Sequence, residues 1–226
     1  MILKNLKTRL LTSIFLIGLL YISFNYTFIL IISLILISLI SWIEFKDLIT
    51  KIFNEKNFKS SFLNLSIQAT SFLYLAMFSG IVFAGISQND FKLNVLFLIC
   101  ICIFSDVGGM LFGKIFKGKK LTKISPNKTI SGSIGSFVLS ILTVPIFYFW
   151  ILDKFNNLGD LIVLAILVSL ICQLGDLFIS FLKRKAKVKD TGDLLPGHGG
   201  VLDRIDGILF AVPIGIAIYE FLIVVI

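Results

Sequence analysis

Residues 27–45 read TFILIISLILISLISWIEF, an unbroken run of mostly Ile, Leu and Phe. An α-helix of about 20 such residues is long enough to cross the ~30 Å hydrocarbon core of a bilayer. Similar runs recur along the whole chain of 226 residues, of which 57% are hydrophobic and only 15% charged. Soluble domains carry about 25% charged residues. The sequence therefore predicts an all-α, polytopic membrane protein.

The apolar runs predict about seven transmembrane helices. These cover residues 10–24, 27–45, 66–87, 94–113, 132–152, 158–182 and 206–226. Seven spans leave no room for a separate soluble domain, so we expect residues 1–226 to form a single integral-membrane domain. The long connections are three, at 46–65, 114–131 and 183–205.

Basic residues predict the orientation of the spans. Of the 21 Lys and Arg residues, 19 lie at the N-terminus or in the three long connections, and only Lys92 and Lys154 fall on the other side. Loops rich in Lys and Arg stay in the cytoplasm, which predicts a cytoplasmic N-terminus and an outside C-terminus. The same placement explains the net charge of +8 by topology and contact with anionic lipid, without a nucleic-acid partner.

Four aspartates within or near predicted spans stand out: Asp106, Asp176, Asp203 and Asp206. A carboxylate in a span costs at least ~2.5 kcal/mol on insertion scales, so each is a candidate for function. Asp106 stands in FSDVGGMLFGK (104–114), whose glycines and Ser105 favour close helix packing. Packing alone is an equally good explanation of that segment.

Asp176 has the stronger pattern, because on a helix it shares a face with Ser180, Lys183 and Arg184. Asp203 and Asp206 share a face at the start of the next span. Carboxylates from two adjoining helices suit Mg²⁺, which takes one or two carboxylates and completes its shell with water and phosphate oxygens. Ion pairs between these aspartates and nearby Lys or Arg are the alternative.

Two loops add groups that could hold a phosphate. PGHGG (196–200) has glycines that let backbone amides approach an anion, and it contains the one histidine, His198. The loop KGKKLTKISPNKTISG (117–132) combines several lysines with Ser125 and Thr129. The alternatives are that His198 is a hydrogen-bonding loop residue and that the 117–132 segment is a solvated basic loop. The residues alone thus indicate a cytoplasm-facing membrane site for a phosphorylated ligand, with Mg²⁺.

Residues 180–206 resemble the signature of the phosphatidate cytidylyltransferases, also called CDP-diacylglycerol synthases. The matching positions are Ser180, Lys183, Arg184, Lys189, Asp190, Gly192, Leu195, Pro196, His198, Gly199, Gly200, Asp203, Arg204 and Asp206. QLGDLF (173–178) and SPNKT (125–129) resemble two further elements of that family. Ile179 and Ser131 stand where members often carry Glu, and the first 90 residues are similar only in being spans.

The resemblance implies transfer of a cytidylyl group from CTP to phosphatidate, giving CDP-diacylglycerol and pyrophosphate for phospholipid synthesis. It implies an enzyme of the inner (plasma) membrane with its site facing the cytoplasm. Residues 1–90 would supply N-terminal spans and 94–226 the catalytic portion, with cytoplasmic loops 114–131 and 183–205. Two alternatives are a CTP-dependent enzyme acting on an isoprenoid or ether-lipid phosphate, and a transporter with an aspartate-lined path. A homodimer is left open.

The resemblance also implies roles for particular residues. The metal ligands are Asp176 and Asp203, for Mg²⁺, and a second cation is left open. The catalytic set is Asp176, Asp203, Asp206, Lys183, Arg184, Lys189, Asp190, His198 and Arg204, in which the basic residues hold phosphates. The substrate-binding set is Asp106, Lys114, Ser125, Lys128, Thr129, Ser180, Gly199 and Gly200.

Overall fold

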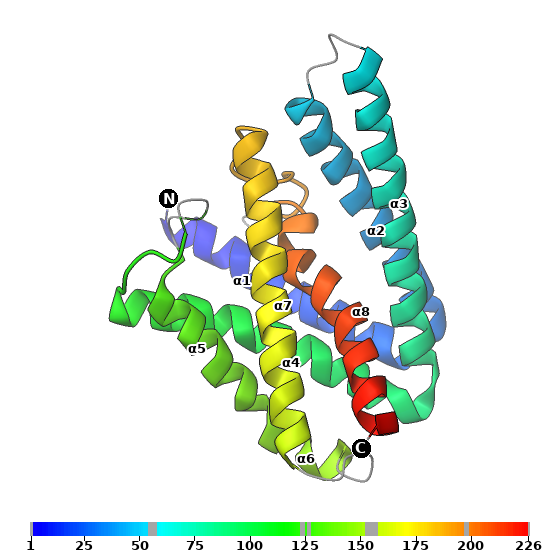
Figure 1. Cartoon of the computed structure of the whole chain (residues 1–226), viewed down its shortest axis with the longest axis vertical. Helices are drawn as coiled ribbons and strands as arrows, with labels where there is room; N and C mark the ends of the chain where they lie inside the picture. Colours follow the sequence, from blue (N-terminus) through cyan, green and yellow to red (C-terminus); the bar gives the residue numbers. More distant parts are fainter. Residues whose placement is uncertain are drawn as a thin grey trace. The chain divides into compact units, whose positions relative to one another are not determined.

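The computed structural model describes residues 2–53, 58–122, 125, 128–151, 158–196 and 199–225, and these residues form helices and no strands (Figure 1). The helices are α1 (Ile2–Asn25), α2 (Thr27–Ile52), α3 (Phe58–Ser87), α4 (Asn89–Phe116), α5 (Ile130–Ile141), α6 (Thr143–Ile151), α7 (Leu158–Lys185) and α8 (Leu202–Val225). The all-α prediction is confirmed for this part of the chain.

Within the described residues, six helical stretches are long and apolar enough to cross a membrane. They are α2, α3, α4, α7, α8 and the α5–α6 stretch Ile130–Tyr148. The first predicted span, 10–24, corresponds to the shorter apolar stretch Leu11–Asn25 of α1. The chain is therefore a multi-pass membrane protein, while the count of seven spans and the orientation of the termini stay predictions.

The predicted span 132–152 consists of two consecutive helices, α5 and α6, rather than one. The break falls at Leu142, whose amide donates to the Val138 carbonyl at 3.1 Å. Pro145 explains its position, since a proline ring clashes with the carbonyl four residues earlier, here that of Ile141. Thr143 Oγ1 donates to the Ser140 carbonyl at 2.6 Å and so satisfies a backbone acceptor beside the break.

The helices divide into two compact units, and α7 and α8 each contribute to both. The first unit contains residues 1–87 and 182–205, the second 88–181 and 206–226. In the first unit α2 packs against α3 (Figure 1). Trp42 joins these two helices, because its indole Nε1 donates to the Gln68 carbonyl at 3.1 Å and its ring meets that of Phe72 edge-on.

In the second unit small residues bring α4 and α5 together. A side chain added at Gly108 would collide with the Gly135 carbonyl. Ser136 Oγ donates to the Ser105 carbonyl at 2.7 Å, a contact that requires the helix backbones to be close. The packing role expected for the glycines of residues 104–114 is thus confirmed. A side chain at Gly207 of α8 would likewise collide with Cys172 of α7.

Candidate functional site

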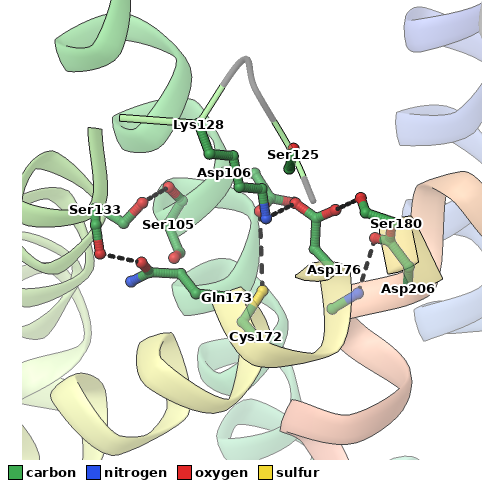
Figure 2. Close-up of polar contacts among 12 residues, drawn as sticks. Ser105, Asp106, Ser125, Lys128, Ser133, Cys172, Gln173, Asp176, Ser180 and Asp206 are labelled. Carbon is green, nitrogen blue, oxygen red and sulfur yellow. Dashed lines mark hydrogen bonds and ion pairs between the residues drawn. The ribbon is translucent and has the colours of Figure 1, made fainter. Parts of the chain in front are cut away.

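Asp176 of α7 forms an ion pair with Lys128 in the second unit (Figure 2). Its other oxygen, Oδ1, accepts a hydrogen bond from Ser180 Oγ at 3.3 Å, so Asp176 and Ser180 share a helix face as expected. About a quarter of each side chain in the ion pair is exposed, 26% for Lys128 and 27% for Asp176. The carboxylate is therefore anchored and still accessible to a ligand.

The backbone of the 117–129 loop positions Lys128. The Leu121 amide donates to the Lys128 carbonyl at 2.8 Å, and the Ile130 amide donates to the Lys119 carbonyl at 2.9 Å. These bonds fold the loop back on itself just before α5. Thr129 caps that helix, since its Oγ1 accepts from the Gly132 amide at 3.1 Å. The Thr129 hydroxyl is therefore already used as the N-terminal cap of α5.

Other predicted residues of the second unit lie on α4, on α8 and in the loop before α5 (Figure 2). Asp106 of α4 receives a weak contact from Cys172 Sγ, at 3.9 Å from its Oδ1. Asp206 is buried, and its Oδ1 accepts from the Gly207 amide at 2.8 Å. Ser125 lies in the basic loop, with its amide donating to Thr122 Oγ1 at 3.2 Å. Lys114 is exposed in the last turn of α4.

Asp203, in the first turn of α8, is the centre of a second cluster, which belongs to the first unit. Its Oδ1 accepts from Lys183 Nζ at 2.6 Å. Its Oδ2 accepts from the backbone amides of Thr191 at 2.8 Å and Gly200 at 3.2 Å. The Asp203 side chain is only 6% exposed and that of Lys183 15%. One carboxylate thus joins the end of α7, the 186–201 loop and the start of α8.

The glycines of the signature permit this arrangement of the loop. Leu195 and Gly199 exchange backbone hydrogen bonds of 2.9 and 3.1 Å, which closes a tight turn. Gly199 has φ +82°, in the left-handed region where a side chain is strained, and an added Cβ would come within 3.2 Å of Asp203 Oδ2. Four further charged residues of the signature are exposed: Arg184, Lys189, Asp190 and Arg204.

Each of the two aspartates predicted to bind metal lies in its own unit and faces a lysine ammonium. The ion pairs that the sequence offered as the alternative are therefore present at both. His198 lies outside the described residues, so its predicted role stays a prediction. The metal site also stays a prediction: the part of the chain that the structure describes contains no cluster of three or more His, Cys, Asp or Glu side chains able to hold a metal.

Glu44 and Thr191 are the residues that the sequence analysis missed. Glu44 of α2 is 6% exposed and accepts a hydrogen bond from Thr191 Oγ1 at 2.8 Å. It also accepts from the amides of Val201 at 3.0 Å and Leu202 at 2.9 Å. A signal for it existed: Glu44 is a carboxylate inside the predicted span 27–45, the criterion that selected the four aspartates.

Three relatives share a large part of this sequence, and each is named phosphatidate cytidylyltransferase. The one from Rickettsia typhi is 42% identical over 59% of this chain and 62% of its own length. The one from Staphylococcus haemolyticus is 36% identical, over 68% of this chain and 58% of its own length. The one from Rickettsia prowazekii is 35% identical, over 69% and 73%. The chain thus spans about six tenths of the first two relatives.

The cluster around Asp203 is built from residues of the signature 180–206, and Asp176 and Lys128 belong to the two further elements, 173–178 and 125–129. The relatives match over much of the chain. The sequence profile of the cytidylyltransferase family matches residues 3–222, nearly the full length. The chain belongs to the cytidylyltransferase family.

Proposed function

We propose that this protein transfers a cytidylyl group from CTP to phosphatidate, giving CDP-diacylglycerol and pyrophosphate. Membership of the cytidylyltransferase family supports the reaction type, and the name shared by the relatives supports phosphatidate as the acceptor. The observation that carries the proposal is the pairing of lysines with aspartates from the matched elements, Lys128 with Asp176 and Lys183 with Asp203. Such pairs supply both the cations and the carboxylates that phosphoryl chemistry needs.

In the proposed reaction a phosphate oxygen of phosphatidate attacks the α-phosphorus of CTP in line. A new P–O bond forms as the bond to pyrophosphate breaks, and pyrophosphate departs with the electron pair. Little covalent chemistry is left to the protein, whose task is to position the two substrates and neutralise their charge. The cations proposed for this are Lys128, Lys183, Arg184, Lys189 and Arg204.

The two lysine ammonium groups are also the reason to propose Mg²⁺ at these carboxylates. Each ammonium group is a cation in contact with an aspartate oxygen, Lys128 with Asp176 and Lys183 with Asp203. Both carboxylates therefore already bind a positive charge, and a metal cation could take the same place. Asp176 has the more accessible carboxylate, and Mg²⁺ in phosphoryl sites needs only one or two protein carboxylates beside phosphate oxygens and water. Bound at either carboxylate, Mg²⁺ would neutralise charge on the nucleotide phosphates. Asp176 would hold it in the second unit and Asp203 in the first, and the paired lysine would then be available to a phosphate.

The proposed substrates agree with a multi-pass membrane protein. Phosphatidate keeps its phosphate at the membrane surface, and CTP is dissolved in the cytoplasm. The basic loops 114–131 and 183–205 would face that side of the inner (plasma) membrane, with seven spans between a cytoplasmic N-terminus and an external C-terminus.

The direct test uses the purified full chain in mixed micelles with labelled CTP, phosphatidate and Mg²⁺. The expected products are labelled CDP-diacylglycerol and pyrophosphate in equal amounts, lost when the metal is chelated. An isoprenoid phosphate and an ether-lipid phosphate serve as parallel acceptors, and neither is favoured by the names of the relatives. Turnover of one of these acceptors with none of phosphatidate would overturn the proposed substrate.

Orientation is tested separately by labelling single cysteines in a cysteine-free variant in intact cells. Positions in 117–128 and 185–200 should react only after the membrane is permeabilised, whereas a cysteine near Asn156 should react from outside. A cytoplasmic C-terminus would refute seven spans, because an N-terminus and C-terminus on one side require an even number of crossings.

A further inference from the structure

Glu44 is a buried carboxylate in the N-terminal part of the chain, where the sequence indicates only apolar spans. It is 6% exposed, and the three hydrogen bonds that it accepts all come from the segment 191–202. Burying a carboxylate is costly unless donors replace its water. Within the described residues its hydrogen-bond donors are one hydroxyl and two backbone amides, so the partners of this charge are neutral groups of the signature segment.

Two of these donors stand at the start of α8. Leu202 is the first residue of α8 and Val201 directly precedes it, and neither amide has a carbonyl within the helix to bond. A carboxylate at this end of a helix is favoured by the aligned peptide dipoles as well as by the hydrogen bonds. Glu44 therefore caps α8 from another helix and holds the turn that carries Asp203.

The glycines of the signature fit around Glu44. A side chain added at Gly192 would lie 2.7 Å from Glu44 Oε1, and one added at Gly200 would collide with Thr191 Oγ1 and the Glu44 carboxylate. The loop backbone thus approaches the carboxylate so closely that only glycine fits at both places. We call Glu44, Thr191, Gly192 and Gly200 the Glu44 clasp.

The clasp shares its members with the Asp203 cluster. Thr191 donates its side chain to Glu44 and its backbone amide to Asp203 Oδ2. Gly200 packs on Glu44 and donates its amide to the same Asp203 oxygen. Glu44 consequently fixes two of the three donors around Asp203, and the third is Lys183.

We infer that Glu44 is a positioning residue, which acts through Thr191 and Gly200 to hold Asp203 and Lys183 in the arrangement that handles substrate phosphate. This inference rests on the proposed function for its effect on catalysis, but the clasp itself can be tested without any substrate. Glu44 touches no reacting atom in this scheme. The N-terminal spans therefore supply a side chain on which the signature depends, beyond anchoring the protein.

The test compares Glu44→Gln with Asp47→Asn, a matched loss of charge one turn along α2 at an exposed residue. The Gln amide group is a donor, and it would face either the Val201 amide or the Leu202 amide together with the Thr191 hydroxyl. Thr191→Val removes only the hydrogen bond from the Thr191 hydroxyl to Glu44 and keeps the side-chain shape. It replaces Glu44→Gln as the test variant if Glu44→Gln does not accumulate. Thr191→Ser keeps the hydroxyl and should rescue the loss.

The first readout is the rate at which a maleimide labels a Val201→Cys reporter in a cysteine-free variant of the full chain. Val201 is 9% exposed, so the reporter should react slowly with the clasp intact. Labelling should become at least about tenfold faster with Glu44→Gln or Thr191→Val, and should stay unchanged with Asp47→Asn or Thr191→Ser. Unchanged labelling in both clasp variants would overturn the inference, whatever the protein catalyses.

The second readout is cytidylyl transfer per folded protein, measured with the natural cysteines in place. Displacing a catalytic group by about 1 Å can cost ~10²-fold in rate, so kcat should fall by about 10- to 100-fold in Glu44→Gln. The double variant with Thr191→Val should lose little more, because both changes weaken the same clasp and act through the same Asp203. Faster labelling with full specific activity would refute the positioning role. Absence of transfer in the unmutated protein would refute the proposed function and leave the labelling result standing.

Discussion

Asp176 and Asp203 have the same side chain and each pairs with a lysine, yet their surroundings differ. Asp203 is 6% exposed and satisfied by an ammonium group and two backbone amides. Asp176 is 27% exposed and bonds to the Lys128 ammonium and the Ser180 hydroxyl. A buried carboxylate must be fully hydrogen-bonded, whereas an accessible one can exchange partners. We expect Asp203 to support both fold and reaction, and Asp176 chiefly the reaction.

The largest effect is expected from Asp203→Asn, because it leaves the Lys183 ammonium, whose side chain is only 15% exposed, without its counter-charge. Breaking a buried ion pair in this way costs about 3 kcal/mol of stability, and loss of one electrostatic stabiliser can lower the rate ~10²–10³-fold. Thermal unfolding in detergent and transfer per folded protein measure the two effects. Normal activity in well-folded Asp203→Asn would refute the proposed role of this residue.

Asp176→Asn should lower the rate as much, ~10²–10³-fold, with little loss of stability. Partly exposed ion pairs contribute only about 0–1 kcal/mol to folding. The unfolding temperature should therefore stay near that of the unmutated protein while transfer is nearly abolished, and added Mg²⁺ should restore little. If the variant instead unfolds easily and keeps its specific activity, the pair with Lys128 is structural and the contrast with Asp203 disappears.

Lys128→Gln tests whether the accessible pair also serves the substrate. A hydrogen bond to a charged group contributes about 1.5–3 kcal/mol, so kcat/KM should fall by ~10- to 10²-fold. Lys51→Gln is the control, an exposed lysine in the last turn of α2, and should behave as the unmutated protein. Steady-state kinetics with varied CTP compares them. Equal small losses in both would assign Lys128 to a solvated basic surface.

The smallest effect is expected from Gly200→Ala, which tests how tightly the Glu44 clasp is packed. The new methyl group would collide with Thr191 and Glu44, and such overpacking costs about 1–3 kcal/mol. Gly80→Ala is the matched change in the same unit, since an added Cβ at Gly80 meets nothing within 4 Å. Only Gly200→Ala should lower the unfolding temperature. Tolerance of this change would mean that the clasp is looser than described.

Much of this molecule could be predicted from local pattern. The helices follow from long apolar runs, and the close packing of α4 on α5 follows from glycines at helical spacing, as Gly108 against Gly135 confirms. The shared face of Asp176 and Ser180 follows from the i, i+4 rule. The break at Leu142 also had a local signal in Pro145, which the length of the apolar run concealed.

The partners of the charged groups could not be predicted in this way. Helical spacing placed Lys183 on the Asp176 face, but Lys183 bonds to Asp203, and the lysine that meets Asp176 is Lys128 from a loop far away in sequence. An ion pair is decided by which atoms the packed backbone brings within about 4 Å. Spacing along one helix contains no information on that distance.

The sequence by itself determined the multi-pass helical class, the family and the candidate residues, because hydrophobic length and a dense signature are local properties of the chain. The tertiary structure alone decided that Glu44 supports the signature, since its three donors lie about 150 residues further on, at Thr191, Val201 and Leu202. A buried carboxylate must find donors wherever the folded backbone presents them. That requirement joins the N-terminal spans to the signature segment, and only the packed chain reveals it.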